Sequence, residues 1–259
     1  MKRWNLILSI LLLILAALCY IFFEVRPITI LQDALANKLL CGFIARAGLG
    51  LLFGWLLYQY SGRRLMIIDK RTPKHLAWSL PCFMVALVNF PYSAIIMGTA
   101  SITRIDLLGL YIAYVISIAI LEEFIFRGSL FILLYDLLRN VRHKPLLIAL
   151  IGASAFALLH LTNILMGADI PSTLLQSIYT FLIGAMLMVT IMRTKNIWIC
   201  VLVHAIFDFG GLLIIQIGAG NPWDLVFWIL TITSGVLCAG HIVYSLIKLE
   251  KEYASSGLI

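Results

Sequence analysis

Long apolar runs alternate with short polar segments along almost the whole chain. A membrane-spanning helix needs roughly 20 apolar residues, because each residue adds about 1.5 Å and the hydrocarbon core is about 30 Å thick. Eight runs are long enough: Trp4–Phe23, Leu39–Tyr60, Leu76–Met97, Leu107–Leu138, Leu146–Leu165, Thr173–Met192, Ile197–Ile217 and Leu225–Ile247. The pattern therefore predicts an all-α fold, a polytopic bundle of about eight transmembrane helices.

Two of these runs are expected to depart from a simple straight span. The fourth, Leu107–Leu138, is too long to cross a membrane perpendicularly, so it should tilt and continue past the bilayer or turn near Gly128. In the third run, Asn89-Phe90-Pro91 should introduce a kink, since proline removes a backbone hydrogen bond.

The composition supports a membrane protein and changes the meaning of the net charge. The chain has 259 residues, of which 63% are apolar and 12% charged, whereas an ordinary soluble domain is about 25% charged. This composition excludes a soluble monomer and a disordered chain. In a membrane protein the net charge of +7 reflects orientation, because Lys and Arg collect in cytoplasmic loops. We expect contact with the lipid bilayer and no nucleic-acid partner.

The basic residues fall mainly on alternate sides of the predicted spans. With the N-terminus placed inside, fourteen of the 19 Lys and Arg residues lie on the inside and three on the outside. The other two, Arg46 and Arg127, lie within spans, and Arg46 should line the bundle or extend to the interface. This asymmetry predicts that both termini are cytoplasmic, and the short basic loops favour a bacterial cytoplasmic membrane.

The first polar group inside a span contains Glu122, Glu123 and Arg127. A charge at the bilayer centre costs roughly 2.5–3.5 kcal/mol on insertion scales, so such a residue needs a partner or a function. Glu123 and Arg127 are four residues apart and can pair along one helix face. Glu122 points about 100° away from Glu123 and is predicted to be the free carboxylate.

Two further groups contain histidine. His160 follows the small residues 152–155, which should let helices approach closely. His204 and Asp208 are four residues apart and share one helix face, where a carboxylate can select the imidazole tautomer. Gly210 and Gly211 follow and are expected to loosen that helix. Each group also has a structural interpretation, as a packing hydrogen-bond donor or as a self-satisfied pair.

Taken in this order, the three groups resemble the family of CAAX-processing and bacteriocin-processing intramembrane proteases, which includes the type II CAAX prenyl endopeptidases. The family pattern is Glu-Glu-x-x-x-Arg, Phe-x-x-x-His and His-x-x-x-Asn or Asp, each on its own transmembrane helix. The matching residues are Glu122, Glu123, Arg127, Phe156, His160, His204 and Asp208. The resemblance covers roughly residues 107–217. It implies N-terminal transmembrane helices without a recognised motif in 1–106, a protease core in 107–217, and a C-terminal transmembrane helix with a cytoplasmic tail in 218–259.

The resemblance implies an endopeptidase acting on a membrane-associated peptide or protein. Glu122 and His160 would activate water, and His204 with Asp208 would stabilise the oxyanion. Glu123, Arg127 and Phe156 would hold the site in shape. Many eukaryotic members carry Asn where this chain has Asp208, and a carboxyl group donates a hydrogen bond only when it is protonated. We therefore expect Asp208 to orient His204 or to ligate a metal.

The sequence leaves the cofactor and two other functions open. One Glu, two His and one Asp could bind a divalent metal such as zinc, although no His-Glu-x-x-His motif is present. Members of the family have been described both as metalloproteases and as glutamate-dependent proteases. A proton-coupled transporter also uses buried acids and histidines, but no inverted repeat is visible. A non-catalytic scaffold or bacteriocin immunity protein would keep the fold without needing Glu122.

Overall fold

The computed structural model describes residues 28–61, 65–66, 68, 70–165 and 167–255, together with positions 11 and 14. Six helices in this part are long and apolar enough to cross a membrane, or seven if one bent pair counts as a span. The predicted polytopic helix bundle is thereby confirmed. The predicted first span, Trp4–Phe23, lies outside the described residues apart from two isolated positions.

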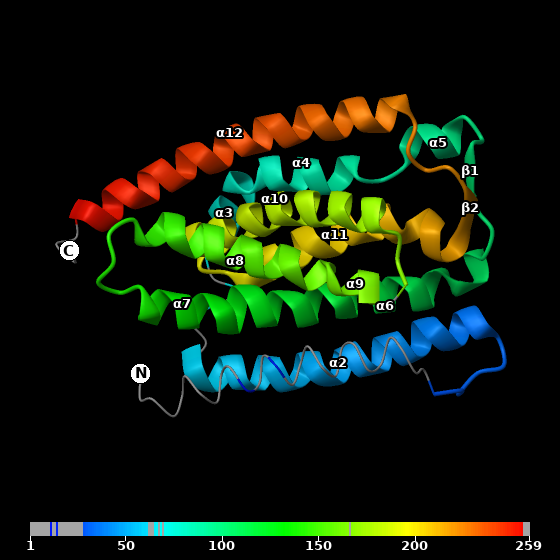
Figure 1. Ribbon diagram of the computed structural model, residues 1–259, viewed down its shortest axis with the longest axis horizontal. Helices are drawn as coiled ribbons and strands as arrows, with labels where there is room; N and C mark the ends of the chain where they lie inside the picture. The colour runs from blue at the N-terminus through cyan, green and yellow to red at the C-terminus, as the bar shows by residue number, and fades with distance from the viewer. Residues whose placement is uncertain are drawn as a thin grey trace.

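Every later apolar run forms a helix or a group of helices (Figure 1). The elements are α2 (Ala34–Ser61), α3 (Thr72–Trp78), α4 (Leu80–Val88), α5 (Tyr92–Ile96), β1 (Ala100–Ile102), η1 (Ile105–Leu107), α6 (Leu108–Glu123), η2 (Phe124–Leu130), α7 (Phe131–Leu137), α8 (Lys144–His160), α9 (Thr162–Leu165), α10 (Ile170–Thr194), α11 (Ile197–Ile217), β2 (Gly218–Gly220) and α12 (Leu225–Ser255).

The long helices lie side by side around a centre formed by α6, α8, α10 and α11. Helix α2 packs along α6, α8 packs along α10, and α11 lies between α6 and α4. Helix α12 covers the far side of the bundle against α4, α8 and α10 (Figure 1). The helices that carry the three polar groups therefore lie in the middle of the bundle, with α2 on one side and α4 and α12 on the other.

The fourth run is one continuous helical stretch of 33 residues, Ile105–Leu137. The helix does not turn near Gly128, so the alternative of a long helix that continues is the correct one. Residues Phe124–Leu130 form a π-helix, in which the hydrogen-bonded turn is one residue wider than in an α-helix. Such insertions are frequent at functional sites, and this one follows directly on Glu122 and Glu123.

The third run is broken into three short helices. Helix α3 and the segment Leu80–Ile96, which contains α4 and α5, meet at an angle of 58°. The helix is interrupted again between Val88 and Tyr92, where the proline-containing segment was expected to kink. At the second break, Asn89 Nδ2 donates a hydrogen bond of 2.8 Å to the carbonyl of Phe207 on α11. The break therefore provides a side chain that binds the neighbouring helix backbone.

Gly210 and Gly211 do not loosen α11, which runs unbroken from Ile197 to Ile217; that prediction was wrong. A Cβ on Gly210 would lie 2.7 Å from the backbone nitrogen of Phe90, and one on Gly211 would lie 2.6 Å from Asn89 Nδ2. The glycines are needed because the broken third span touches α11 here.

A short strand pair closes one end of the bundle. Strand β1 pairs antiparallel with β2, with Ala100 opposite Gly220 and Ile102 opposite Gly218. The backbone nitrogens of Thr103 and Arg104 both donate to the carbonyl of Ile217 at 3.0 Å. The pair joins the start of the α6 stretch to the end of α11.

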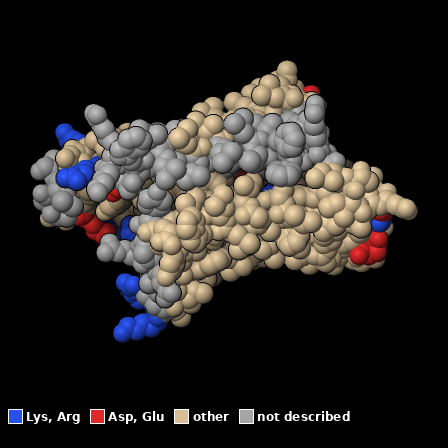
Figure 2. Space-filling model, turned by 90° about the horizontal axis from the view of Figure 1, so that it is seen from below, with Lys and Arg blue, Asp and Glu red and all other residues tan. Residues whose placement is uncertain are grey.

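The opposite end is rich in Lys and Arg, and we refer to it as the basic end. It contains the start of α3, the α7–α8 and α10–α11 connections and the end of α12 (Figure 1). Its described basic residues are Lys70, Arg71, Lys74, Arg139, Arg142, Lys144, Arg193, Lys195, Lys248 and Lys251. On the face drawn in Figure 2, these charges gather at one end and a long surface almost free of charge separates them from the other end.

Candidate active site

The acidic pair lies where α6 passes into the π-helix. Glu123 and Arg127 are both fully buried, and Arg127 Nη1 donates to Glu123 Oε1 at 2.8 Å. The predicted pairing is confirmed. Arg127 Nη2 also donates to the carbonyl of Gly184 at 3.3 Å, so the guanidinium links this helix to α10.

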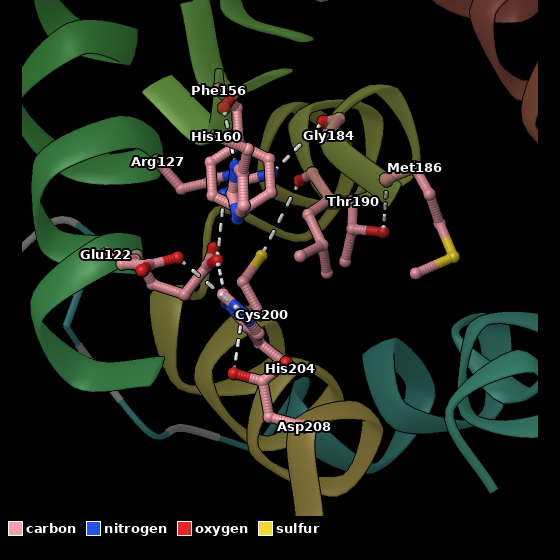
Figure 3. Close-up of polar contacts among 12 residues, drawn as sticks. Glu122, Arg127, Phe156, His160, Gly184, Met186, Thr190, Cys200, His204 and Asp208 are labelled. Atoms are coloured by element: carbon pink, nitrogen blue, oxygen red, sulfur yellow. Dashed lines mark hydrogen bonds and ion pairs between the residues drawn. The ribbon is translucent and has the colours of Figure 1, made fainter. Parts of the chain in front are cut away.

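His204 comes from α11 and lies among three carboxylates (Figure 3). Its Nδ1 donates to Glu123 Oε1 at 2.7 Å. Its Nε2 lies 3.4 Å from Asp208 Oδ2 and 3.8 Å from Glu122 Oε2. The acid that holds Arg127 therefore also orients His204, and its contact is shorter than the contact with Asp208. Spacing along the sequence could not reveal this, since Glu123 and His204 lie on different helices.

Glu122 has a different environment from its neighbour. Its side chain is buried, yet Oε2 accepts no hydrogen bond from any described residue. Its closest polar contact given by the structure is the 3.8 Å approach to His204 Nε2. Glu123 Oε2 is also without a partner among the described residues, so the two acids differ in that Glu123 forms the ion pair with Arg127 and Glu122 does not.

His160 and Phe156 come from the last turn of α8. His160 Nδ1 lies 2.9 Å from the carbonyl oxygen of Phe156. Because a carbonyl can only accept, Nδ1 carries the proton of the neutral ring and Nε2 is left as an acceptor. His160 also interacts electrostatically with Glu122. The two predicted water-activating groups therefore lie in one neighbourhood, although they belong to different helices.

The Phe156 ring packs against both imidazoles and the guanidinium. It meets His160 edge-on at 4.9 Å and His204 at 5.9 Å between ring centroids. Arg127 Cζ lies 4.6 Å from the centre of the same ring. One apolar ring therefore packs against three polar side chains of the site.

The small residues of α8 bring α10 close to the site, as predicted. A Cβ on Gly184 of α10 would lie 3.1 Å from the Cα of Ala153, and a Cβ on Gly152 would overlap the side chain of Met188. This close approach puts the Gly184 carbonyl within reach of Arg127. Gly184 is a site residue that sequence reasoning missed, since its contribution is a backbone oxygen.

Two more residues around the site were not predicted to take part. The hydroxyl of Tyr111 on α6 donates to the carbonyl of Phe209 at 2.6 Å and reaches the carbonyl of Asp208 at 3.3 Å, joining α6 to the helix of His204. Arg46 of α2 is buried, with Cζ 4.9 Å from the Tyr114 ring centre, and it interacts electrostatically with Glu122. Arg46 therefore lines the bundle and does not extend to the interface.

The candidate metal ligands do not form a metal site as they are placed. Among the described residues, no group of three or more His, Cys, Asp or Glu side chains is arranged to hold a metal ion. Glu123 binds His204 Nδ1 and the Phe156 carbonyl binds His160 Nδ1, which leaves Nε2 of each ring as the nitrogen that could ligate a metal. As they are placed, these nitrogens and the neighbouring carboxylates are not arranged to hold one ion.

Buried carboxylates, two imidazoles and a guanidinium inside a polytopic helix bundle are groups that an intramembrane protease requires. Comparison with known families gives the particular kind. Residues 104–210 match the family described as type II CAAX prenyl endopeptidase Rce1-like, and the match contains all three motifs. The segment that contains the site is therefore similar to this family of membrane-embedded proteases. No curated protein and no solved structure matches the chain.

Proposed function

We propose that this protein is an endopeptidase that hydrolyses a peptide bond of a membrane-associated protein or peptide. The contrast between two adjacent acids carries the proposal. Oε2 of each acid is buried and accepts no hydrogen bond from any described residue, but the other oxygen of Glu123 accepts from both Arg127 and His204, whereas Glu122 lies 3.8 Å from His204 Nε2. A buried acceptor without a partner is costly, and at Glu122, which is not held by an arginine, a bound water would satisfy it. That water is the nucleophile.

In the proposed reaction, Glu122 takes a proton from the water as its oxygen attacks the carbonyl carbon of the scissile bond. His160 accepts a hydrogen bond from the same water at Nε2, which orients its lone pair. The oxyanion that forms accepts a hydrogen bond from His204 Nε2. Glu122 then gives its proton to the leaving nitrogen as the C–N bond breaks, so the products are a carboxylic acid and an amine.

The surrounding residues support this division of roles. Glu123 accepts the proton of His204 Nδ1, so Nε2 can donate to the oxyanion only when the ring carries a proton on both nitrogens. The carboxylates of Glu123 and Asp208 would balance that charge, and the proton on Nε2 points toward Asp208 and Glu122, where the substrate carbonyl would be. Asp208 orients the same nitrogen. Phe156 and Arg127 exclude water from the other side of both rings, and hydrogen bonds are stronger in such a water-poor site.

The test compares Glu122→Gln with Glu252→Gln, the same substitution on an exposed acid that pairs with Arg193. Each variant replaces the wild-type protein in cells, and the membrane proteome is searched for new peptide termini. Cleavage products should persist with Glu252→Gln and fall about 10²–10⁴-fold with Glu122→Gln. If both variants give the wild-type products, the proposal is wrong. A cellular phenotype that survives Glu122→Gln would favour the scaffold or immunity role.

The metal question has its own test with the same cleavage readout. Purified protein is treated with a chelator and then supplied with zinc. The donor arrangement leads us to expect that activity is not lost and restored in this way. Restoration by zinc would mean that Glu122, His160, His204 and Asp208 rearrange to bind it.

We also propose that the basic end faces the cytoplasm, most simply in a bacterial cytoplasmic membrane. The gathering of Lys and Arg at this end supports the proposal. An impermeant thiol reagent added to intact cells should label Asn221→Cys, at the strand-pair end. It should label Arg142→Cys only after the membrane is opened. The opposite pattern would reverse the orientation.

A further inference from the structure

Two lysines at the basic end share one aromatic side chain. Lys144 begins α8 and is only 3% exposed, and its Nζ lies 3.3 Å from the ring centre of Tyr135. Lys195 lies between α10 and α11, and its Nζ is 5.6 Å from the same ring and 5.4 Å from that of Phe131. Two like charges are therefore held near one another by elements that are distant in the sequence.

Two described acids at this end are bound to partners other than the two lysines. Glu250 binds His143 and the backbone nitrogen of Leu146, and Glu252 binds Arg193. In the described part of the chain neither lysine forms an ion pair or a hydrogen bond with a carboxylate; their recorded contacts are with aromatic rings. The cluster thus has an excess of positive charge.

Electrostatics at Lys195 reflect this excess. Burial of its ammonium group, and then the nearby positive charge of Lys144, lower the pKa of Lys195 below its ordinary value. Asp136 and Arg139 also act on Lys144, with opposite signs. A bound anion would remove the repulsion between the lysines.

The backbone around the two lysines is also unusual. His143, directly before Lys144, and Lys195 itself are the non-glycine residues with positive φ in the described chain, at 58° and 53°. Glycine is the residue that adopts this conformation without strain. At the end of α10 the protein has a lysine at such a position, and so keeps a charged side chain there.

We propose that Lys144 and Lys195 bind the phosphate group of an anionic phospholipid. The pair lies at the end of the spanning helices, which is the level of the lipid headgroups, and a phosphate can accept hydrogen bonds from both ammonium groups. Leu137 and Leu146, on either side of the α7–α8 connection, are 53% and 37% exposed and are available to the acyl chains. These apolar neighbours favour a lipid over free phosphate.

Such a lipid would connect several helices near the site. Lys144 Nζ also lies 5.5 Å from the ring centre of Tyr253 on α12. Tyr135 belongs to the helix that follows the π-segment, and Lys195 precedes the helix of His204. One headgroup would therefore brace α7, α8, α12 and the α10–α11 connection, and its binding should be visible as a gain in thermal stability.

The experiment measures the melting temperature of the full-length protein in a nonionic detergent. Phosphatidylglycerol, phosphatidylcholine or sodium phosphate is added in increasing amounts. Phosphatidylglycerol should raise the melting temperature, and the other two should have much smaller effects. The apparent affinity should weaken roughly 30-fold in Lys144→Gln/Lys195→Gln, since each basic residue near anionic lipid contributes about a fivefold factor. An equal shift with sodium phosphate would overturn the assignment to a lipid.

The matched control is Lys248→Gln/Lys251→Gln, which removes the same charge from exposed positions of α12 at the same end. It should keep the wild-type response. An equal loss in the two double variants would overturn the proposal, because the effect would then be general electrostatics. If the Lys144 variant does not fold, the Lys195→Gln variant alone should show about a fivefold loss of affinity, and an unchanged affinity would overturn the proposal.

Discussion

Loss of the Arg127 charge should destabilise the protein far more than loss of an equivalent charge at its surface. Arg127→Met keeps an apolar stem of similar length but leaves Glu123 fully buried, with His204 as its remaining hydrogen-bond partner at that oxygen. Breaking a buried ion pair by removing one partner costs about 3–5 kcal/mol. Each kcal/mol lowers the melting temperature of a protein of this size by roughly 2–4 °C, so a fall of about 6–20 °C is expected.

The assay is thermal unfolding in one detergent, with Arg193→Met as the control. That substitution removes a guanidinium that pairs with the half-exposed Glu252 at 2.8 Å. Exposed pairs contribute little to stability, so the control should melt close to the wild type.

A double variant separates the stranded charge from lost packing. Glu123→Gln/Arg127→Met removes both charges and should recover most of the lost stability, while activity stays low because His204 loses its orienting acid. The reasoning is refuted if Arg127→Met melts like Arg193→Met. It is also refuted if the double variant is no more stable than Arg127→Met.

Three further predictions follow from other contacts. Gly210→Ala should lower stability by about 1–3 kcal/mol, because the new Cβ meets the backbone of the third span; Gly235→Ala, where a Cβ meets nothing within 4 Å, should be neutral or stabilising in the same melting assay. In a cleavage assay, His204→Ala should lower the cleavage rate about 10²–10³-fold. Asp208→Asn should lower this rate less than about tenfold, because the amide oxygen can still face the imidazole. Equal losses of rate in the two variants would contradict the proposed roles. Hydrogen bonds from a backbone N–H of the first turn of α12 and then from a serine hydroxyl lower the pKa of Asp224. Its stabilising effect should be present above about pH 4 and disappear as the pH falls through the lowered pKa; Asp224→Ala should weaken the acid dependence of melting, and an identical dependence would rule this effect out.

The transmembrane helices could be predicted because the apolar runs are bounded by polar residues. Ile197–Ile217 coincides with the structural helix, which begins where Asn196 accepts a hydrogen bond from the backbone nitrogen of Trp198. Helix α12 continues to Ser255, beyond the apolar run, because a polar helix can extend out of a bilayer. Hydropathy could not reveal the break at Ser79, where an apolar run changes direction.

The site was predictable as a set of residues but not as a set of contacts. The cost of charges in an apolar span singled out Glu122, Glu123 and Arg127, and helix spacing identified the ion pair. The contact between Glu123 and His204 depends on how α6 and α11 align along their lengths, which no local pattern specifies. The same holds for the π-helix, since one apolar run, Leu107–Leu138, contains both the π-helix and the α-helix before it.

The strand pair has a mechanical consequence for the two helices that it joins. Backbone hydrogen bonds tie the start of the α6 stretch to the end of α11, and parting them would break several bonds at once. Glu122 lies on the first of these helices and His204 on the second. Any change in their separation by movement of whole helices must therefore be a pivot about the tied end, and the gap between the helices would widen toward the basic end.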